Sequence, residues 1–301
     1  MAENLDPNEL SEILKEKRQK QQKLKKAIKF ISLIAFLVFL ILSTWAFWLE
    51  PNHLVITKAD LAISHWHKEH NGLKIALLTD LHVGSPHISL EKLDLLVKET
   101  NKQSPDLVVI LGDLVITAIV GGNFVEPEPI AKGLKNLQSP LGIVAVLGNH
   151  DWWYNGERVR QALEKEGITV LENDAIKLTK NNKDFWIAGL AEPWTRKVDI
   201  PATLGKITDD NPVLMLTHSP DIFPQIPERV SLTLAGHTHG GQVKLPLLGR
   251  PIVPSAFGER YAIGHIIENN RHLFVGSGVG TSIIPVRFCV PPEVVILSIN
   301  K

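Results

Sequence analysis

The sequence predicts an α/β fold in which functional residues gather at the carboxyl ends of buried strands, preceded by one transmembrane helix. Apolar runs rich in β-branched residues each end next to a polar residue, at positions 75–79, 107–111, 143–147, 213–217 and 232–235. Such runs are typical of strands in a sheet that is covered on both faces, and in α/β folds ligands bind where these strands end. An uncharged run from Phe30 to Leu49 comes before them and predicts the transmembrane helix.

Amphipathic stretches between these runs predict crossover helices. The clearest is Leu90 to Thr100, and similar patterns occupy residues 130–137 and 159–165. Further strands are expected at residues 168–171, 185–188, 273–275 and 294–299. With 301 residues the chain can form one large catalytic domain and an appendage. We therefore predict a basic, helical tail (1–29), a transmembrane helix (30–49), a link with an edge strand (50–72) and a catalytic domain (73–301).

Charge and tryptophan positions predict how the apolar run is oriented. Lys25, Lys26 and Lys29 lie before it, whereas Trp45 and Trp48 lie at its other end. Basic residues stay on the cytoplasmic side and indoles favour the interface, so we expect a single-pass protein of the bacterial cytoplasmic (inner) membrane with its catalytic domain extracytoplasmic. A cleaved signal peptide is the alternative, which the long basic segment and the lack of an Ala-x-Ala pattern disfavour.

The polar residues that follow the strand runs share one chemistry. They supply carboxylates, an amide oxygen and imidazoles, in the segments Asp80-Leu81-His82, Gly112-Asp113, Gly148-Asn149-His150-Asp151, His218 and Gly236-His237-Thr238-His239. Each segment alone is an ordinary helix cap or turn. Because five separate segments obey the same rule, together they predict a metal site. The absence of a thiolate favours Mn, Fe or Zn in expanded coordination over a structural zinc site.

From Leu73 to the C-terminus the chain resembles the calcineurin-like metallophosphoesterase superfamily, and within it the membrane-anchored YkuE- and YaeI-type phosphodiesterase branch. The resemblance is carried by the motifs above and by residues 217–221, 236–242 and 278–293. It implies two packed mixed β-sheets flanked by helices, a four-layer sandwich with two divalent metal ions at one edge. It also implies the ligands: Asp80, His82, Asp113 and His239 for one metal, and Asp113, Asn149, His218 and His237 for the other, so that Asp113 bridges. His150 is then the catalytic residue that contacts phosphate and protonates the leaving oxygen.

This site predicts hydrolysis of a phosphodiester or phosphomonoester. Two divalent cations beside two carboxylates leave an excess of positive charge, which favours an anionic phosphate and a hydroxide shared between the metals. Protein phosphatases of this superfamily carry arginines near Gly112-Asp113 and Gly148, and this chain has none there. We expect a lipid-linked or cell-envelope substrate. The alternatives are cleavage of UDP-2,3-diacylglucosamine in lipid A biosynthesis, and a non-catalytic envelope binding module.

Several other residues have two interpretations. Trp152, Trp153 and Tyr154 could form an aromatic wall beside the site or simply pack, and Asp151 could orient His150 or a ligand, or cap a helix. We expect Cys289 to be buried in its apolar run. The histidines at positions 65, 67 and 70 are expected to be exposed residues near an edge strand. The net charge of zero predicts no nucleic-acid partner, and the pattern does not indicate an oligomeric state.

Overall fold

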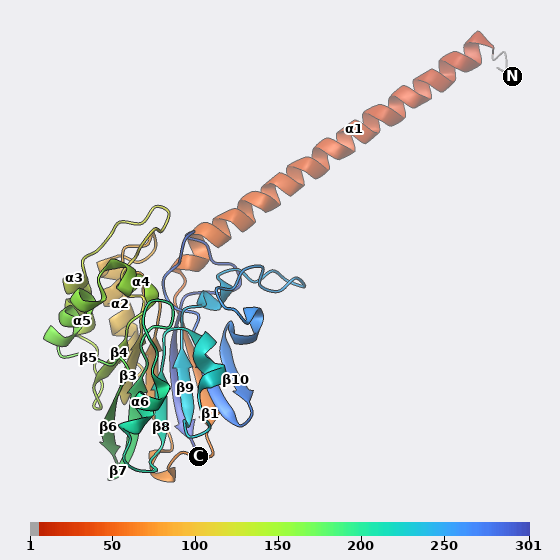
Figure 1. The fold of residues 1–301 in the computed structure, drawn as a ribbon. Coiled ribbons are helices and arrows are strands. Elements are labelled where there is room, and N and C mark those ends of the chain that lie inside the picture. The colour runs from red at the N-terminus through yellow and green to blue at the C-terminus, as the bar shows by residue number, and fades with distance from the viewer. Residues whose placement is uncertain (1–5) are drawn as a thin grey trace. The chain divides into compact units, whose positions relative to one another are not determined.

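A computed structural model describes residues 6–301, in which two six-stranded mixed sheets carry the site (Figure 1). The first sheet has the order β1-β12-β2-β3-β4-β5 and the second β10-β11-β9-β8-β7-β6. The strands of the first are β1 (Val55–Ala62), β12 (Glu293–Asn300), β2 (Leu73–Leu78), β3 (Leu107–Leu111), β4 (Ile143–Val146) and β5 (Thr169–Val170). Those of the second are β10 (Gly264–Glu268), β11 (Arg271–Val275), β9 (Leu232–Ala235), β8 (Val213–Leu216), β7 (Lys183–Gly189) and β6 (Asp174–Lys180).

The direction of the strands places the polar residues that follow them at one edge of the two sheets. Strands β2 to β5 are mutually parallel, as are β7, β8, β9 and β11. We call the side where these strands end the site edge. Strand β12 is antiparallel to β2, so the chain terminus lies at the opposite edge (Figure 1). Strand β1 is parallel to β12 and therefore begins at the site edge.

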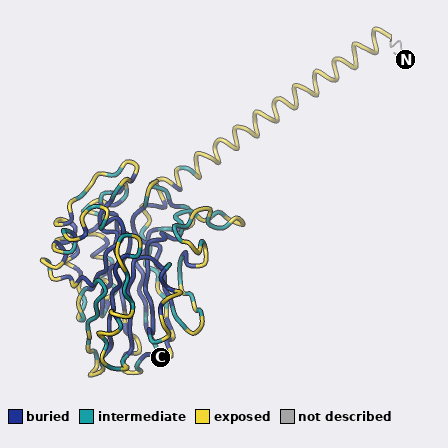
Figure 2. Tube along the Cα trace, in the orientation of Figure 1, coloured by how far each residue is buried: buried dark blue, intermediate teal, exposed yellow. Residues whose placement is uncertain are grey.

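Helices complete four layers. Helices α2 (Leu90–Asn101), α3 (Pro127–Leu134) and α5 (Gly156–Lys165) pack through Leu93, Ile130 and Val159 on the first sheet. Helix α6 (Ile200–Gly205) and a short helix at Pro220–Gln225 pack on the second sheet. Between the sheets lies a separate apolar layer, and the central strands of both sheets are mostly buried (dark blue in Figure 2). The predicted sandwich of two mixed sheets flanked by helices is thus confirmed.

The N-terminal segment is one long helix, α1 (Pro7–Thr44), which a π-helical turn (Trp45–Leu49) and a 3-10 turn (Glu50–Asn52) extend. Asp6 caps it by accepting a hydrogen bond from the amide of Asn8. Up to Asn52 this helix is long and apolar enough to cross a membrane. The chain divides into two compact units after Ala46, and the predicted boundary at residues 29 and 30 falls inside α1. Residues 1–5 of the predicted tail lie outside the described residues.

Two predictions about burial were wrong. Cys289 is exposed, because residues 286–290 form an irregular segment and Cys289 has a left-handed backbone (φ 55°). His70 is fully buried: its Nε2 donates to the carbonyl oxygens of Lys180 and Lys183, and its ring packs on Phe185. The predicted edge strand is confirmed as β1, whereas β6, β10, α4 (Asn149–Tyr154) and α6 were not expected.

Candidate metal centre

The structure brings all seven predicted ligands together at the site edge. Asp80 and His82 follow β2, Asp113 follows β3, and Asn149 begins α4 in the loop after β4. From the second sheet, His218 follows β8. The last two ligands, His237 and His239, follow β9, and all seven side chains are buried or nearly so.

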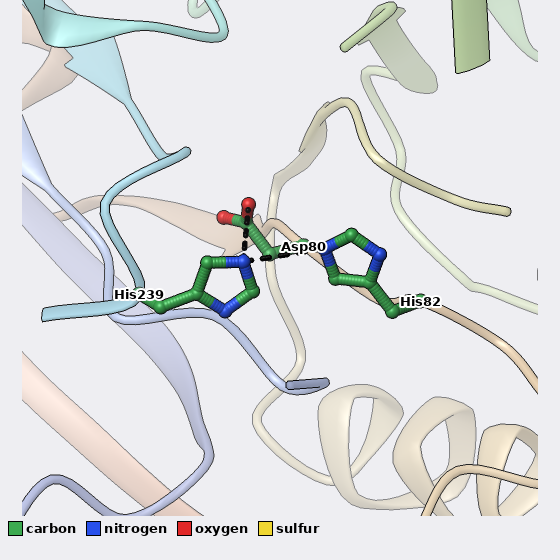
Figure 3. A group of neighbouring side chains, drawn as sticks. All are labelled: Asp80, His82 and His239. Carbon is green, nitrogen blue, oxygen red and sulfur yellow. Dashed lines mark hydrogen bonds and ion pairs between the residues drawn. The ribbon is translucent and has the colours of Figure 1, made fainter. Parts of the chain in front are cut away.

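Asp80, His82 and His239 form the first cluster (Figure 3). Nε2 of His239 lies 3.3 Å from Oδ1 of Asp80 and 3.2 Å from Nε2 of His82. The two rings stack at 5.0 Å with an angle of 20° between their planes. The other carboxylate oxygen of Asp80 accepts hydrogen bonds from the Thr79 hydroxyl and the His237 amide, which fixes its orientation.

Asp113, Asn149, His218 and His237 form the second cluster. Nε2 of His218 lies 3.2 Å from Oδ2 of Asp113, 3.1 Å from Oδ1 of Asn149 and 3.2 Å from Nδ1 of His237. A single proton on this nitrogen can serve only one of those three atoms. The opposite ring nitrogen of His218 donates to the carbonyl oxygen of Leu111, which holds Nε2 toward the cluster.

Asp113 joins the two clusters. Its Oδ2 lies 3.2 Å from Nε2 of His218 and 3.6 Å from Nε2 of His82, so one oxygen faces both groups. Its Oδ1 accepts a hydrogen bond of 2.8 Å from the backbone amide of His150. A carboxylate in this position can bridge two cations.

The ligand loops have an uncommon backbone. Five of the seven side chains stand on residues in the left-handed region, Asp80, His82, Asp113, His237 and His239, with φ between 43° and 69°. Such conformations cost free energy for residues other than glycine and cluster at functional sites. Two glycines allow the loops to approach: a Cβ on Gly148 would lie 2.2 Å from Oδ1 of Asp113, and one on Gly236 would lie 1.8 Å from the Thr79 hydroxyl oxygen.

Asp151 holds the Asp113 loop. Its Oδ2 accepts from the amides of Asp113 and Gly148, and its Oδ1 from those of Leu114 and Val115. Burial and the Asp113 charge raise the pKa of Asp151 to about 7, against the effect of the N–H donors. Cations at Asp113 would offset that charge and favour the ionised form. Of the predicted roles, Asp151 orients a ligand and the start of α4 rather than the His150 ring.

His150 lies beside both clusters and is oriented by Thr117. His82, Asp113 and His150 form a third close group. The backbone amide of Thr117 donates to Nδ1 of His150, with the Thr117 hydroxyl 2.6 Å from the same nitrogen. Because Nδ1 accepts, the proton of the neutral ring is on Nε2. Burial lowers the pKa of His150, which favours this neutral form.

Charge and hydrogen bonding in the clusters suit cations. Burial lowers the pKa of His82, His237 and His239 to about 3, so these rings are neutral as metal ligands must be. Burial alone would also lower the pKa of His218, but the Asp113 carboxylate raises it to about 10. The buried Oδ1 of Asp80 has no hydrogen-bond partner and lies 3.3 Å from Nε2 of His239. An orphaned carboxylate oxygen and facing imidazole nitrogens fit a divalent metal better than an apolar core.

A buried arginine supports the loop that contacts Asp80 of the first cluster. Arg287 is fully buried and donates to the carbonyl oxygens of Ser277, Gly278, Gly280 and Val290. The amide of Gly280 in turn donates to the carbonyl oxygen of Asp80 over 2.7 Å. The loop at residues 276–280 is therefore a close-packed support for Asp80.

Two exposed indoles flank the clusters. The ring of Trp153 lies 4.8 Å from His150, and that of Trp194 lies 4.5 Å from His237. Glu192 accepts hydrogen bonds from the amides of Trp194 and Thr195 and so fixes this loop. By contrast, Trp152 packs on the core, and the Tyr154 hydroxyl donates a hydrogen bond to Glu126. Of the predicted aromatic wall, only Trp153 therefore reaches the site. Neither Trp194 nor Thr117 follows a recognisable motif, and sequence reasoning missed both.

The fold and the paired clusters define a metal-dependent hydrolase. The calcineurin-like phosphoesterase family matches residues 73–241, and the chain belongs to this family of metal-dependent phosphoester hydrolases, which use a dinuclear divalent centre. It is 30% identical to the uncharacterized metallophosphoesterase YkuE of Bacillus subtilis, over 85% of this chain and 89% of that protein. It is 32% identical to the phosphodiesterase YaeI of Escherichia coli, over 75% and 82%. It is also 29% identical to a transmembrane protein with a metallophosphoesterase domain from Danio rerio, over 74% of this chain and 52% of that protein.

Proposed function

We propose that the chain is a membrane-tethered phosphodiesterase or phosphatase that acts on a lipid-linked or cell-envelope phosphoester. One metal would be held by Asp80, His82, Asp113 and His239, and the other by Asp113, Asn149, His218 and His237. The observation that carries the proposal is the shared Oδ2 of Asp113, which faces a histidine nitrogen of each cluster at 3.2 and 3.6 Å. Two bound divalent ions would supply Lewis-acid charge for the phosphate and activate water at neutral pH.

The chain's own residues would provide the remaining functions. His150 presents an Nε2 proton beside the clusters because Thr117 occupies Nδ1, so it is placed to donate to the leaving oxygen. Asp151 keeps the Asp113 carboxylate in position through the backbone amides around it. Both functions depend on buried, hydrogen-bonded groups and need no large movement of the loops.

The surroundings of the clusters favour a diester with an apolar or sugar-bearing group. The Arg287 guanidinium donates to backbone carbonyl oxygens and is fully buried, so it is not free to clamp a phosphate dianion. The exposed faces of Trp153 and Trp194 instead offer apolar surface on two sides. Indoles stack on sugars and pack on acyl or prenyl groups.

The proposed location follows from α1. Its apolar length suits a membrane span, and a relative is named a transmembrane protein. Lysines before the span support a cytoplasmic N-terminus and an extracytoplasmic catalytic unit at the inner membrane. A reporter fused to the C-terminus tests this orientation. Activity only on the cytoplasmic side would reverse it and favour the UDP-2,3-diacylglucosamine substrate.

Hydrolysis is tested with the purified full-length chain. Metal-free protein would be reloaded with Mn, Fe or Zn and assayed on bis-p-nitrophenyl phosphate, on a monoester and on lipid phosphodiesters, with metal content measured on the same samples. Asp113→Asn is the control because it keeps the shape of the shared side chain. We expect metal-dependent turnover only in the unmodified protein. If the unmodified protein shows no metal-dependent turnover above that of Asp113→Asn, the non-catalytic binding module is the better explanation.

A further inference from the structure

Exposed apolar side chains gather in the loops at the site edge. We define the apolar rim as Trp48, Val120, Leu247, Leu248, Ile283 and Ile284, all of them exposed. Leu248 is 79% exposed and Leu247 is fully exposed. In the turns at the opposite edge, residues 63–72, 102–106, 181–182, 206–212 and 269–270, the described chain has no exposed large hydrophobic residue. The asymmetry indicates a surface that contacts something apolar.

The rim begins where the membrane span ends. Residues 47–54 lead into β1, which starts at the site edge because it is parallel to β12 and β12 is antiparallel to β2. The ring of Trp48 lies 6.4 Å from that of His87, and His87 also lies against the backbone of Phe47 and Pro285. The exit of the span and the loop at 283–285 are therefore neighbours in the catalytic unit.

Backbone contacts connect the rim loops to one another and to the metal clusters. The amide of Val120 donates to the carbonyl oxygen of Ile283 over 2.9 Å. Gln242, at the start of the segment that carries Leu247 and Leu248, accepts from the amide of Ser282 and donates to the carbonyl oxygen of Ile284. The loop that contains Ser282, Ile283 and Ile284 also contains Gly280, whose amide donates to the carbonyl oxygen of Asp80 in the first cluster.

Two exposed rim residues have a strained backbone. Leu247 has φ 68° and Ile283 has φ 61°, in the region that favours glycine and asparagine. For the β-branched Ile283 this is a true outlier. Stability in water would favour a small polar residue at both positions, so the aliphatic side chains point to a function outside the folded core.

We propose that the apolar rim docks the catalytic unit on the lipid bilayer, with Leu247, Leu248 and Ile283 entering the boundary between head groups and acyl chains. The metal clusters, at the same edge, then open toward the leaflet from which the span emerges. A bilayer is the occupant because the rim continues directly from the end of the span and presents aliphatic residues with an interfacial tryptophan. The inference rests on the proposed tether but not on the proposed hydrolysis.

Site-specific quenching in the full-length chain tests this docking. Cys289, the only cysteine, is replaced by serine, and single cysteines are introduced as Leu248→Cys, Ile283→Cys and, at the opposite edge, Asp210→Cys. Each carries a polarity-sensitive dye after reconstitution into phosphatidylcholine–phosphatidylglycerol vesicles that contain lipids spin-labelled on the acyl chain. We expect about twofold or greater quenching at positions 248 and 283, since interfacial side chains reach ~5–10 Å into the bilayer, and little at 210.

The outcomes separate the tether from the docking. Protein that floats with vesicles but shows equal, weak quenching at all three positions would overturn the docking alone. Protein that fails to float would overturn both. Dyes that are shielded from water but not quenched by labelled lipid would assign the rim to a second copy of the chain, against the proposal. Adding Leu247→Asp and Leu248→Asp should lower quenching at position 283 to the level at 210, while hydrolysis of bis-p-nitrophenyl phosphate stays unchanged.

Discussion

Asp151→Asn is the sharpest test of how the site is held together. The substitution keeps the size of the side chain and replaces none of the seven predicted ligands. It replaces one carboxylate oxygen by an NH₂ group. Because each oxygen of Asp151 accepts two backbone amides at 2.9 to 3.2 Å, either orientation of the new amide leaves two buried N–H groups facing a donor.

These contacts determine how much free energy of unfolding Asp151→Asn should lose. A buried donor left without an acceptor costs about 1–3 kcal/mol, so two of them predict a loss of about 2–6 kcal/mol in the free energy of unfolding. The loss should be larger in the metal-loaded protein, because cations at Asp113 favour the ionised form of Asp151. Metal affinity should fall by the difference between the two losses.

Urea unfolding of the full-length protein in detergent, with and without Mn, measures both quantities. Asp210→Asn serves as the matched control, since Asp210 is exposed. A loss below about 1 kcal/mol in Asp151→Asn, similar to that of the control, would refute the view that this carboxylate is what holds the ligand loop.

Three further predictions concern the clusters directly. Asp113→Asn should lower kcat by about a thousandfold or more and reduce bound metal, as measured by steady-state kinetics and by elemental analysis, because both clusters lose their shared oxygen. Thr117→Val should lower kcat about tenfold and broaden its pH profile with little change in KM, because it removes the hydroxyl that lies 2.6 Å from Nδ1 of His150. Thr117→Ser keeps a hydroxyl there and should keep kcat near that of the unmodified protein. The raised pKa of His218, about 10, means that its proton is present at pH 7 and must leave when metal binds. Metal affinity should therefore rise up to about tenfold per pH unit between pH 7 and 10, with about one proton released per chain in calorimetry in two buffers; no release would contradict this.

The sequence predicted the parts of the site that follow from strand ends. Runs of buried residues mark where β2, β3, β4, β8 and β9 end, and parallel strands bring those ends to one edge, so the pattern groups the five polar segments. The choice of the seven ligands within these segments came from the resemblance to the family. Periodicity also located α2 and β12 to within a residue or two. These features depend on local pattern and on a general rule of sheet geometry.

Features set by loop conformation could not be predicted in this way. The left-handed backbones of Asp80, His82 and Asp113 come from the tertiary fit of the loops and leave no mark in composition. Thr117 reaches His150 only because the loop after β3 folds back on α4. The apolar residues around Cys289 in the sequence predict that it is buried. The segment is irregular, however, and leaves Cys289 exposed. Trp194 lies in a loop held by Glu192, a contact that only the fold creates.

The pairing of β1 with β12 has a consequence for how the protein matures. These strands pair along their whole length, from Val55 with Glu293 to Ala62 with Asn300, and β1 joins its sheet through β12 alone. Strand β1 therefore has no partner in its sheet until residues 293–300 have been synthesised. Such pairing between segments far apart in the sequence slows folding. Without residues 293–300, β1 and β2 would lose the strand that lies between them and pairs with both.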